Sequence, residues 1–207
     1  MSYDKDAFYH NSKCHSLILK DELNISYLSI LPILNSSLFW FYLLKNGNIL
    51  RGNYVGVKRK VLEPFGVPEI NEKNRIELEE LASLALEIQG QFQKSRGKFI
   101  SYIQGSFRIG KVSRKLENWH ELYFSEFIKE LNKAIKKTNR ERAKEGLEPV
   151  KHLTKKDEFE WMELFEENKK KVVNLQQQID QIDQKVDRMV YKLYGLTEEE
   201  IAIVEAS

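Results

Sequence analysis

Two stretches of the chain contain several basic residues and no acidic residue, a pattern typical of surfaces that bind a polyanion. They lie between Leu23 and Leu62 and between Lys94 and Lys115. Basic side chains neutralise phosphates, and Arg, Asn and Gln side chains can also hydrogen-bond to base edges. One such stretch would fit an ordinary solvated face, but two in a nearly neutral protein favour nucleic-acid binding.

We therefore predict that polar side chains in these stretches contact double-stranded DNA. The predicted DNA-binding residues are Lys45, Asn46, Asn48, Arg51, Asn53, Tyr54, Lys58, Arg59, Lys60, Arg96, Lys98, Arg108, Lys111, Arg114 and Lys115.

No motif predicts catalysis. The chain lacks a glycine-rich phosphate loop and the Asn-Pro-Pro-aromatic tetrad of amino-methyltransferases. His10, Cys14 and His15 do not match a zinc-binding pattern, and no fourth ligand is evident. We predict no catalytic residue, metal or cofactor in this chain. A nuclease with a degenerate site at Glu63 or Glu148 is an alternative.

Charge and cysteine content limit the cellular context. Residues 1–115 carry 17 Lys and Arg against 11 Asp and Glu, whereas residues 116–207 carry 16 against 20. The basic front half again favours a polyanionic partner. The single Cys14 excludes an intramolecular disulfide, and the apolar run Leu28–Leu44 contains too many polar residues to span a bilayer. We predict a cytoplasmic protein without a membrane partner or a signal peptide.

The C-terminal region carries the clearest structural pattern. Its apolar residues recur at alternating spacings of three and four, which predicts a long helix packed along another helix. We expect Thr154 or Asp157 to cap this helix, Gly195 to end it, and Thr197 with Glu200 to start a short helix at 198–205. The seam consists of Phe165, Val172, Leu175, Ile179, Ile182, Val186, Met189 and Leu193, with Asn168 as a register-setting polar position.

Three further helices are predicted, at residues 27–45, 71–93 and 116–137. Pro32 should lie in the first turn of the first helix or bend it, and Gly47 should end that helix in a left-handed conformation. We expect the second helix to pair antiparallel with the C-terminal one. Residues 94–115 are predicted to break the helical pattern, with their apolar residues packed in a hairpin or helical turn. Residues 7–19 and 51–62 are predicted to be extended.

The predicted fold class is mainly α with a small β-containing module (α+β). An elongated antiparallel helical or coiled-coil unit follows a short mixed region. Residues 1–70 would form the first domain and residues 71–207 a helical scaffold.

Several motifs resemble a known family. They are Leu34-Asn35-Ser36-Ser37-Leu38-Phe39-Trp40-Phe41-Tyr42, Arg51-Gly52-Asn53-Tyr54, Leu62-Glu63-Pro64, Leu116-Glu117-Asn118-Trp119-His120-Glu121-Leu122 and Met189-Val190-Tyr191-Lys192-Leu193-Tyr194-Gly195-Leu196-Thr197. Together they are similar to the C-terminal specificity region of type II restriction–modification enzymes with N6-adenine methyltransferase chains, the TaqI-like specificity domain family.

This resemblance implies DNA-sequence recognition without catalysis. Residues 1–70 would be the distal part of a target-recognition module, and S-adenosylmethionine and Mg²⁺ would belong to missing upstream domains. The implied partners are double-stranded DNA and a methyltransferase or nuclease domain or subunit. The alternative is a helical interaction scaffold that docks such a subunit, with oligomerisation through the Val172–Leu193 seam.

Overall fold

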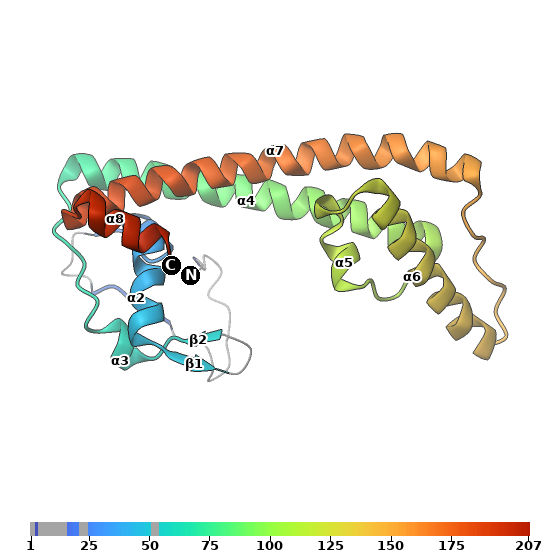
Figure 1. Ribbon diagram of the computed structural model, residues 1–207, viewed down its shortest axis with the longest axis horizontal. Helices are drawn as coiled ribbons and strands as arrows, with labels where there is room; N and C mark the ends of the chain where they lie inside the picture. Colours follow the sequence, from blue (N-terminus) through green and yellow to red (C-terminus); the bar gives the residue numbers. More distant parts are fainter. Residues whose placement is uncertain (1–2, 4–15, 21–24, 51–53) are drawn as a thin grey trace. The chain divides into compact units, whose positions relative to one another are not determined.

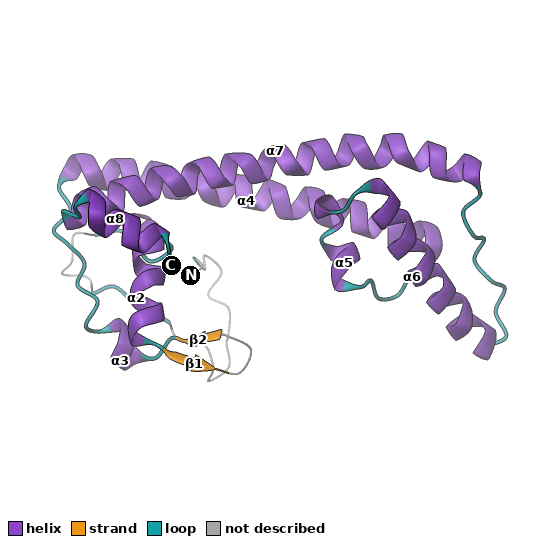
Figure 2. Ribbon diagram, viewed as in Figure 1, coloured by secondary structure: helices purple, strands orange, loops and turns teal. Residues whose placement is uncertain are grey.

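The computed structural model describes residues 3, 16–20, 25–50 and 54–207, and within these residues the protein is mostly helical (Figures 1 and 2). The mainly α prediction is therefore confirmed. The elements in chain order are α1 (Tyr27–Ile33), α2 (Ser37–Asn46), β1 (Asn48–Leu50), β2 (Tyr54–Gly56), α3 (Arg59–Leu62), α4 (Glu72–Phe107), α5 (Arg114–Glu117), the 3-10 turn η1 (Trp119–Glu121), α6 (Phe124–Lys144), α7 (Lys155–Tyr194) and α8 (Glu198–Glu205).

The chain forms two compact units. Unit 1 comprises residues 1–86 and 180–207, and unit 2 comprises residues 87–179. The long helices α4 and α7 each contribute residues to both units. The predicted domain boundary at residue 70 stays a prediction.

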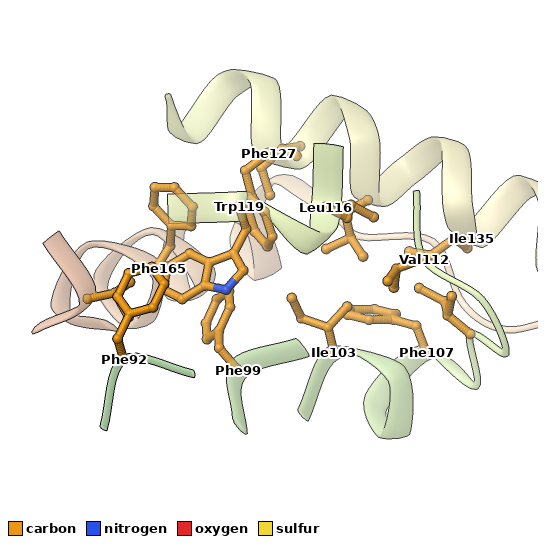
Figure 3. Packing of buried hydrophobic residues seen from close by; sticks show 14 residues of the cluster. Phe92, Phe99, Ile103, Phe107, Val112, Leu116, Trp119, Phe127, Ile135 and Phe165 are labelled. Carbon is orange, nitrogen blue, oxygen red and sulfur yellow. The ribbon is translucent and has the colours of Figure 1, made fainter. Parts of the chain in front are cut away.

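Unit 2 is built around a cluster of aromatic side chains (Figure 3). The rings of Phe99 and Trp119 lie 4.1 Å apart, and those of Phe127 and Phe165 lie 4.8 Å apart. Phe99 of α4 meets Phe165 of α7, whereas Phe107 meets Trp161, so α4 and α7 run antiparallel within this unit. These contacts lie beyond residues 71–93, so the predicted pairing of that range with the C-terminal helix stays a prediction.

Helix α4 continues to Phe107, so the predicted break at residue 94 is wrong. Phe92, Phe99, Ile103 and Phe107 are all buried, and their spacing of seven, four and four keeps them on one face. A glycine in a helix costs about 1 kcal/mol relative to alanine. Burial of four large side chains outweighs the two glycines in this segment.

The predicted helix at 116–137 is divided and displaced. The structure has α5 and η1 first, and then α6, which starts at Phe124 and ends at Lys144. The Glu126 carboxylate accepts a hydrogen bond from the Tyr123 backbone N–H at 3.0 Å, which fixes the start of α6. The C-terminal third of α6 therefore lies in a segment that the sequence indicated to be a charged connection.

The predicted C-terminal helices are confirmed. Helix α7 begins after Thr154, whose hydroxyl accepts from the Asp157 N–H, and it is followed by Gly195 at φ +65°. Thr197 and Glu200 form the expected capping box of α8. Asn168 does not set the register, because its amide donates to the Leu164 carbonyl of its own helix at 2.7 Å. The apolar seam residues of α7 are all buried or half-buried.

The predicted helix at 27–45 consists of two helices, α1 and α2, which meet at an angle of 64°. Pro32 lies in the last turn of α1 rather than the first. The Ser36 hydroxyl donates to the Ile33 carbonyl at 2.7 Å and accepts from the Phe39 N–H at 3.2 Å, so it closes one helix and opens the next.

Gly47 does not adopt the predicted left-handed conformation, since its φ is −81°. A glycine is required here because its neighbours leave no room for a side chain. A Cβ at this position would lie 2.5 Å from Val55 Cγ1 and 2.6 Å from the Leu43 carbonyl oxygen.

The predicted β-containing module is not confirmed. The described residues contain one antiparallel pair of three-residue strands, β1 and β2, and Arg59–Leu62 is helical rather than extended. Most of the predicted strand at residues 7–19 lies outside the described residues, and residues 16–19 form no regular structure.

No single helix within the described residues is long and apolar enough to cross a membrane. Helices α1 and α2 satisfy the length and composition criteria only when they are taken together across their bend.

The N-terminus of α2 depends on a carboxylate of α7. Asp187 accepts hydrogen bonds from the Ser37 backbone N–H and from the Ser37 hydroxyl, both at 2.7 Å. Asp187→Ala leaves both donors without this acceptor and should lower the free energy of unfolding by about 1–3 kcal/mol in urea titrations. Glu160→Ala, at an exposed site of α7, is the control and should change it by less than about 0.5 kcal/mol. Equal effects of the two variants would contradict this role.

Candidate nucleic-acid interface

The second basic stretch lies on the last turns of α4, on the connection to α5 and on α5 itself, all within unit 2. Lys98, Arg108, Lys111, Arg114 and Lys115 are exposed. Their outward orientation follows from the apolar residues between them, because Phe99, Phe107, Ile109, Val112 and Leu116 are all buried. The structure therefore brings five of the six predicted bases of this stretch to the surface of one unit.

Arg96 is the exception, because it is half-buried and contacts residues of the core. Its guanidinium lies 5.7 Å from the centre of the Phe92 ring and donates to Asn118 Oδ1 at 3.4 Å. Its backbone carbonyl accepts a hydrogen bond from the Trp119 indole at 3.3 Å. These contacts give Arg96 a structural role in joining α4 to η1.

The connection between α4 and α5 is a defined turn. Arg108 adopts a left-handed conformation at φ +52°. The Ile109 N–H donates to the Gln104 carbonyl at 3.0 Å, and the Gln104 amide donates to the Gly110 carbonyl at 3.2 Å. The buried Ile109 side chain anchors the turn to the core of unit 2, so Arg108 and Lys111 extend from an ordered backbone.

The first basic stretch lies in unit 1, at the end of α2, on the β1–β2 hairpin and at the start of α3. Arg51 and Asn53 lie outside the described residues. The hairpin register pairs Asn48 with Gly56 and Leu50 with Tyr54. Side chains alternate along a strand, so Asn48 and Tyr54 share the face opposite Val55, which packs on the apolar cluster of this unit. Lys45, Asn46, Asn48, Tyr54, Lys58, Arg59 and Lys60 are all exposed.

Three residues of this first set already have partners. The Asn46 amide donates to the Tyr42 carbonyl at 2.9 Å. Arg59 pairs with Glu63 at 2.6 Å, and the Lys45 ammonium lies 5.3 Å from the centre of the Phe41 ring. Asn48 and Tyr54 are therefore the better candidates for reading bases, and Lys58 and Lys60 for contacting phosphates.

The charge asymmetry follows the structural units. Unit 2 carries 20 Lys and Arg against 14 Asp and Glu, a balance of +6, whereas the residues of unit 1 carry 13 against 17, a balance of −4. Division of the chain at residue 115 does not show this distribution, because the bases of α6 are then counted together with the acids of residues 180–207. The bases of α6 would have been visible as a helical period of lysines continuing beyond residue 137.

No group of three or more His, Cys, Asp or Glu side chains that could hold a metal occurs among the described residues. His10, Cys14 and His15 lie outside them. His120 is buried between aromatic rings, with ring centres 5.4 Å from Phe92 and 5.9 Å from Trp119. It belongs to the core of unit 2, where its Nδ1 has no hydrogen-bond partner among the residues described.

The chain is a helical protein of two units. In unit 2, helices that pack on an aromatic core carry exposed basic side chains. The chain belongs to the family of the domain of unknown function DUF8810, whose model matches residues 71–190, from the start of α4 almost to the end of α7. No curated protein and no solved structure matches the chain.

The buried histidine makes the stability of the protein depend on pH. Burial lowers the pKa of His120 from its ordinary 6.5; Arg96 and Lys169 lower it further, while Glu121 raises it. The unfolded chain therefore binds this proton first, and the free energy of unfolding should decrease as the pH falls below about 6.5.

His120→Gln should reduce this loss when unfolding midpoints at about pH 7.5 and pH 5.5 are compared. His152→Gln, at an exposed position, is the control and should retain the pH dependence of the wild type. The same pH dependence in the His120 variant and the wild type would contradict the assignment.

Proposed function

We propose that the protein binds double-stranded DNA as the non-catalytic recognition part of a restriction–modification system. The observation that carries the proposal is the acid-free stretch of unit 2, in which five exposed bases lie on the last turns of α4, on the ordered connection to α5 and on α5 itself. Because the backbone of this connection is already ordered, only the side chains lose conformational freedom when they meet phosphates.

Two kinds of contact are proposed. Lys98, Lys111 and Lys115 would contact phosphates, which supply most of the affinity without sequence information. Asn48 and Tyr54 share one hairpin face and would supply base contacts, because Asn can hydrogen-bond to adenine in the major groove. Arg96 is left out, since its guanidinium is used within the core.

The resemblance to TaqI-like specificity domains supplies the finer part of the proposal. S-adenosylmethionine, Mg²⁺ and the catalytic residues would belong to other domains or subunits. The proposal also includes an elongated antiparallel coiled coil formed by α4 and α7, supported by the burial of their apolar stripes. The proposed location is the bacterial cytoplasm.

A helical scaffold that docks a methyltransferase or nuclease subunit is the second candidate function. The α7 seam is a poor docking surface, because its side chains are already buried or half-buried within the chain. Exposed apolar side chains favour another location. Trp40 of α2 is 48% exposed and Ile203 of α8 is 59% exposed, and these two helices contact each other in unit 1.

Salt-dependent binding of a duplex tests the proposed function. Lys98→Gln/Lys111→Gln/Lys115→Gln removes three proposed phosphate contacts. Each contact contributes about 0.9 to the slope of log K against log salt concentration, so the slope should become shallower by about 2.7. Fluorescence anisotropy with a labelled duplex of mixed sequence gives this slope.

The matched control is Lys155→Gln/Lys170→Gln/Lys171→Gln, which removes three exposed lysines from α7. It changes the net charge equally and should leave the slope within about 0.5 of the wild type. Absence of binding at low salt, or equal losses in both variants, would contradict the proposal. Sequence recognition is tested by selecting bound duplexes from a random library, where Asn48→Ala should relax the consensus at one or two positions.

A further inference from the structure

The exposed face of α6 carries a stripe of basic side chains. Lys129, Lys133, Lys136, Lys137, Arg140 and Lys144 are all exposed. At 100° per residue they fall within an arc of about 100°, and at 1.5 Å per residue the stripe is about 22 Å long. We name these six residues the α6 stripe; the helix is labelled in Figure 1.

Packing fixes the direction of the α6 stripe. Phe127, Leu131 and Ile135 have no exposed surface and lie on the opposite side of the helix, in the aromatic core of unit 2. Asn139 holds the later chain segment, because its amide donates to the Val150 carbonyl at 2.9 Å and its carbonyl accepts from the Val150 N–H at 2.7 Å. Rotation of α6 would bury charge, so the stripe must face outward.

Little of this charge is neutralised within the protein. Lys133 pairs with Glu130 at 2.7 Å, and Lys137 lies 3.9 Å from Glu141. Among the described residues, no carboxylate lies within 4.0 Å of the charged groups of Lys129, Lys136, Arg140 or Lys144. The remaining base of the helix, Arg142, lies outside the arc and donates to the Glu148 carbonyl at 2.7 Å. Glu126, at the start of α6, is the one acid in the arc.

The exposed surface of α7 in the same unit differs. There the exposed acids Glu160, Glu163, Glu166 and Glu167 lie between two pairs of exposed bases, Lys155 with Lys156 and Lys170 with Lys171, as expected for an ordinary solvated face. Segregation of bases on α6 is thus a property of that helix and not of the unit as a whole.

We infer that the α6 stripe binds the sugar–phosphate backbone of duplex DNA, independently of sequence. DNA carries one negative charge per about 1.7 Å of its axis, so a straight row of flexible bases about 22 Å long meets phosphates along its full length. Lysine predominates, and it acts as a point charge suited to phosphate contact rather than to bidentate reading of guanine.

An anionic lipid surface fits the α6 stripe less well. A helix that lies on a membrane inserts apolar side chains beside its bases. The apolar residues of α6 are committed to the core, and none of the strongly exposed large apolar side chains among the described residues belongs to Phe124–Lys144. The inference rests on the proposed function for its partner, but it concerns a different surface.

The test compares three proteins with a labelled duplex at rising salt. They are the wild type, Lys129→Gln/Lys136→Gln/Arg140→Gln, and the α7 control Lys155→Gln/Lys170→Gln/Lys171→Gln. Glutamine keeps a high helix propensity, and circular dichroism with thermal unfolding checks that each variant is folded. The salt slope of the α6 variant should become shallower by about 2–3, equally for unrelated duplex sequences, and that of the control should not change. Lys129→Arg/Lys136→Arg should retain the wild-type slope.

The outcomes separate this inference from the proposed function. An unchanged slope in the α6 variant, with weaker binding by the Lys98, Lys111 and Lys115 variant, overturns the inference alone. The reverse result supports the α6 stripe and overturns the proposed site. Absence of duplex binding by the wild type overturns both. Binding to phosphatidylserine vesicles without duplex binding, or preference for duplex RNA over DNA, overturns the choice of partner.

Discussion

The structure depends on the burial of the apolar faces of α4, α6 and α7 in unit 2. Phe99, Trp119 and Phe165 lie at the centre of this core, and each is almost fully buried. Truncation of such a residue to alanine typically costs about 3–5 kcal/mol, whereas an exposed ion pair contributes about 0–1 kcal/mol. The core therefore determines the direction of each helix, and the surface charges contribute little to that choice.

Because the core and not the surface charge directs the helices, a basic surface can exist on a protein whose net charge is only +2. Since Phe99, Phe107 and Ile109 face inward, the bases between them must face solvent. In α6, burial of Phe127, Leu131 and Ile135 likewise turns the α6 stripe on the opposite side toward solvent. Like charges three or four residues apart on a helix cost only about 0.2–0.5 kcal/mol per pair, so a segregated row costs little compared with the core. The charges remain free to act on a partner.

Local sequence patterns predicted the C-terminal helices well because their determinants are local. The heptad spacing, the Thr154 cap, Gly195 and the Thr197–Glu200 box each act within a few residues. The break at residues 94–115 was predicted wrongly because glycines and bases suggest a loop. The segment up to Phe107 is helical because its apolar side chains are buried in the core of unit 2. The division between α1 and α2 depends on the Ser36 hydroxyl, whose double role is not evident from periodicity.

The candidate site was predicted in part for a similar reason. A search for acid-free segments finds bases that are adjacent in sequence, such as those of residues 94–115. The α6 stripe interleaves with Glu130 and Glu141 along the chain and becomes continuous only when the helical period and the buried face are known. Arg96 shows the opposite error, since a base in an acid-free segment is used inside the core.

The central claim is that the bases of unit 2 contact the DNA phosphates, and lysine footprinting tests it most directly. The protein is acetylated briefly with and without a saturating duplex, and each lysine is quantified by mass spectrometry. The account predicts protection of Lys98, Lys111, Lys115, Lys129 and Lys136, and unchanged labelling of Lys170 and Lys171, which lie exposed on α7. Protection confined to the α7 lysines, or equal labelling of all lysines in the presence of bound duplex, would contradict it.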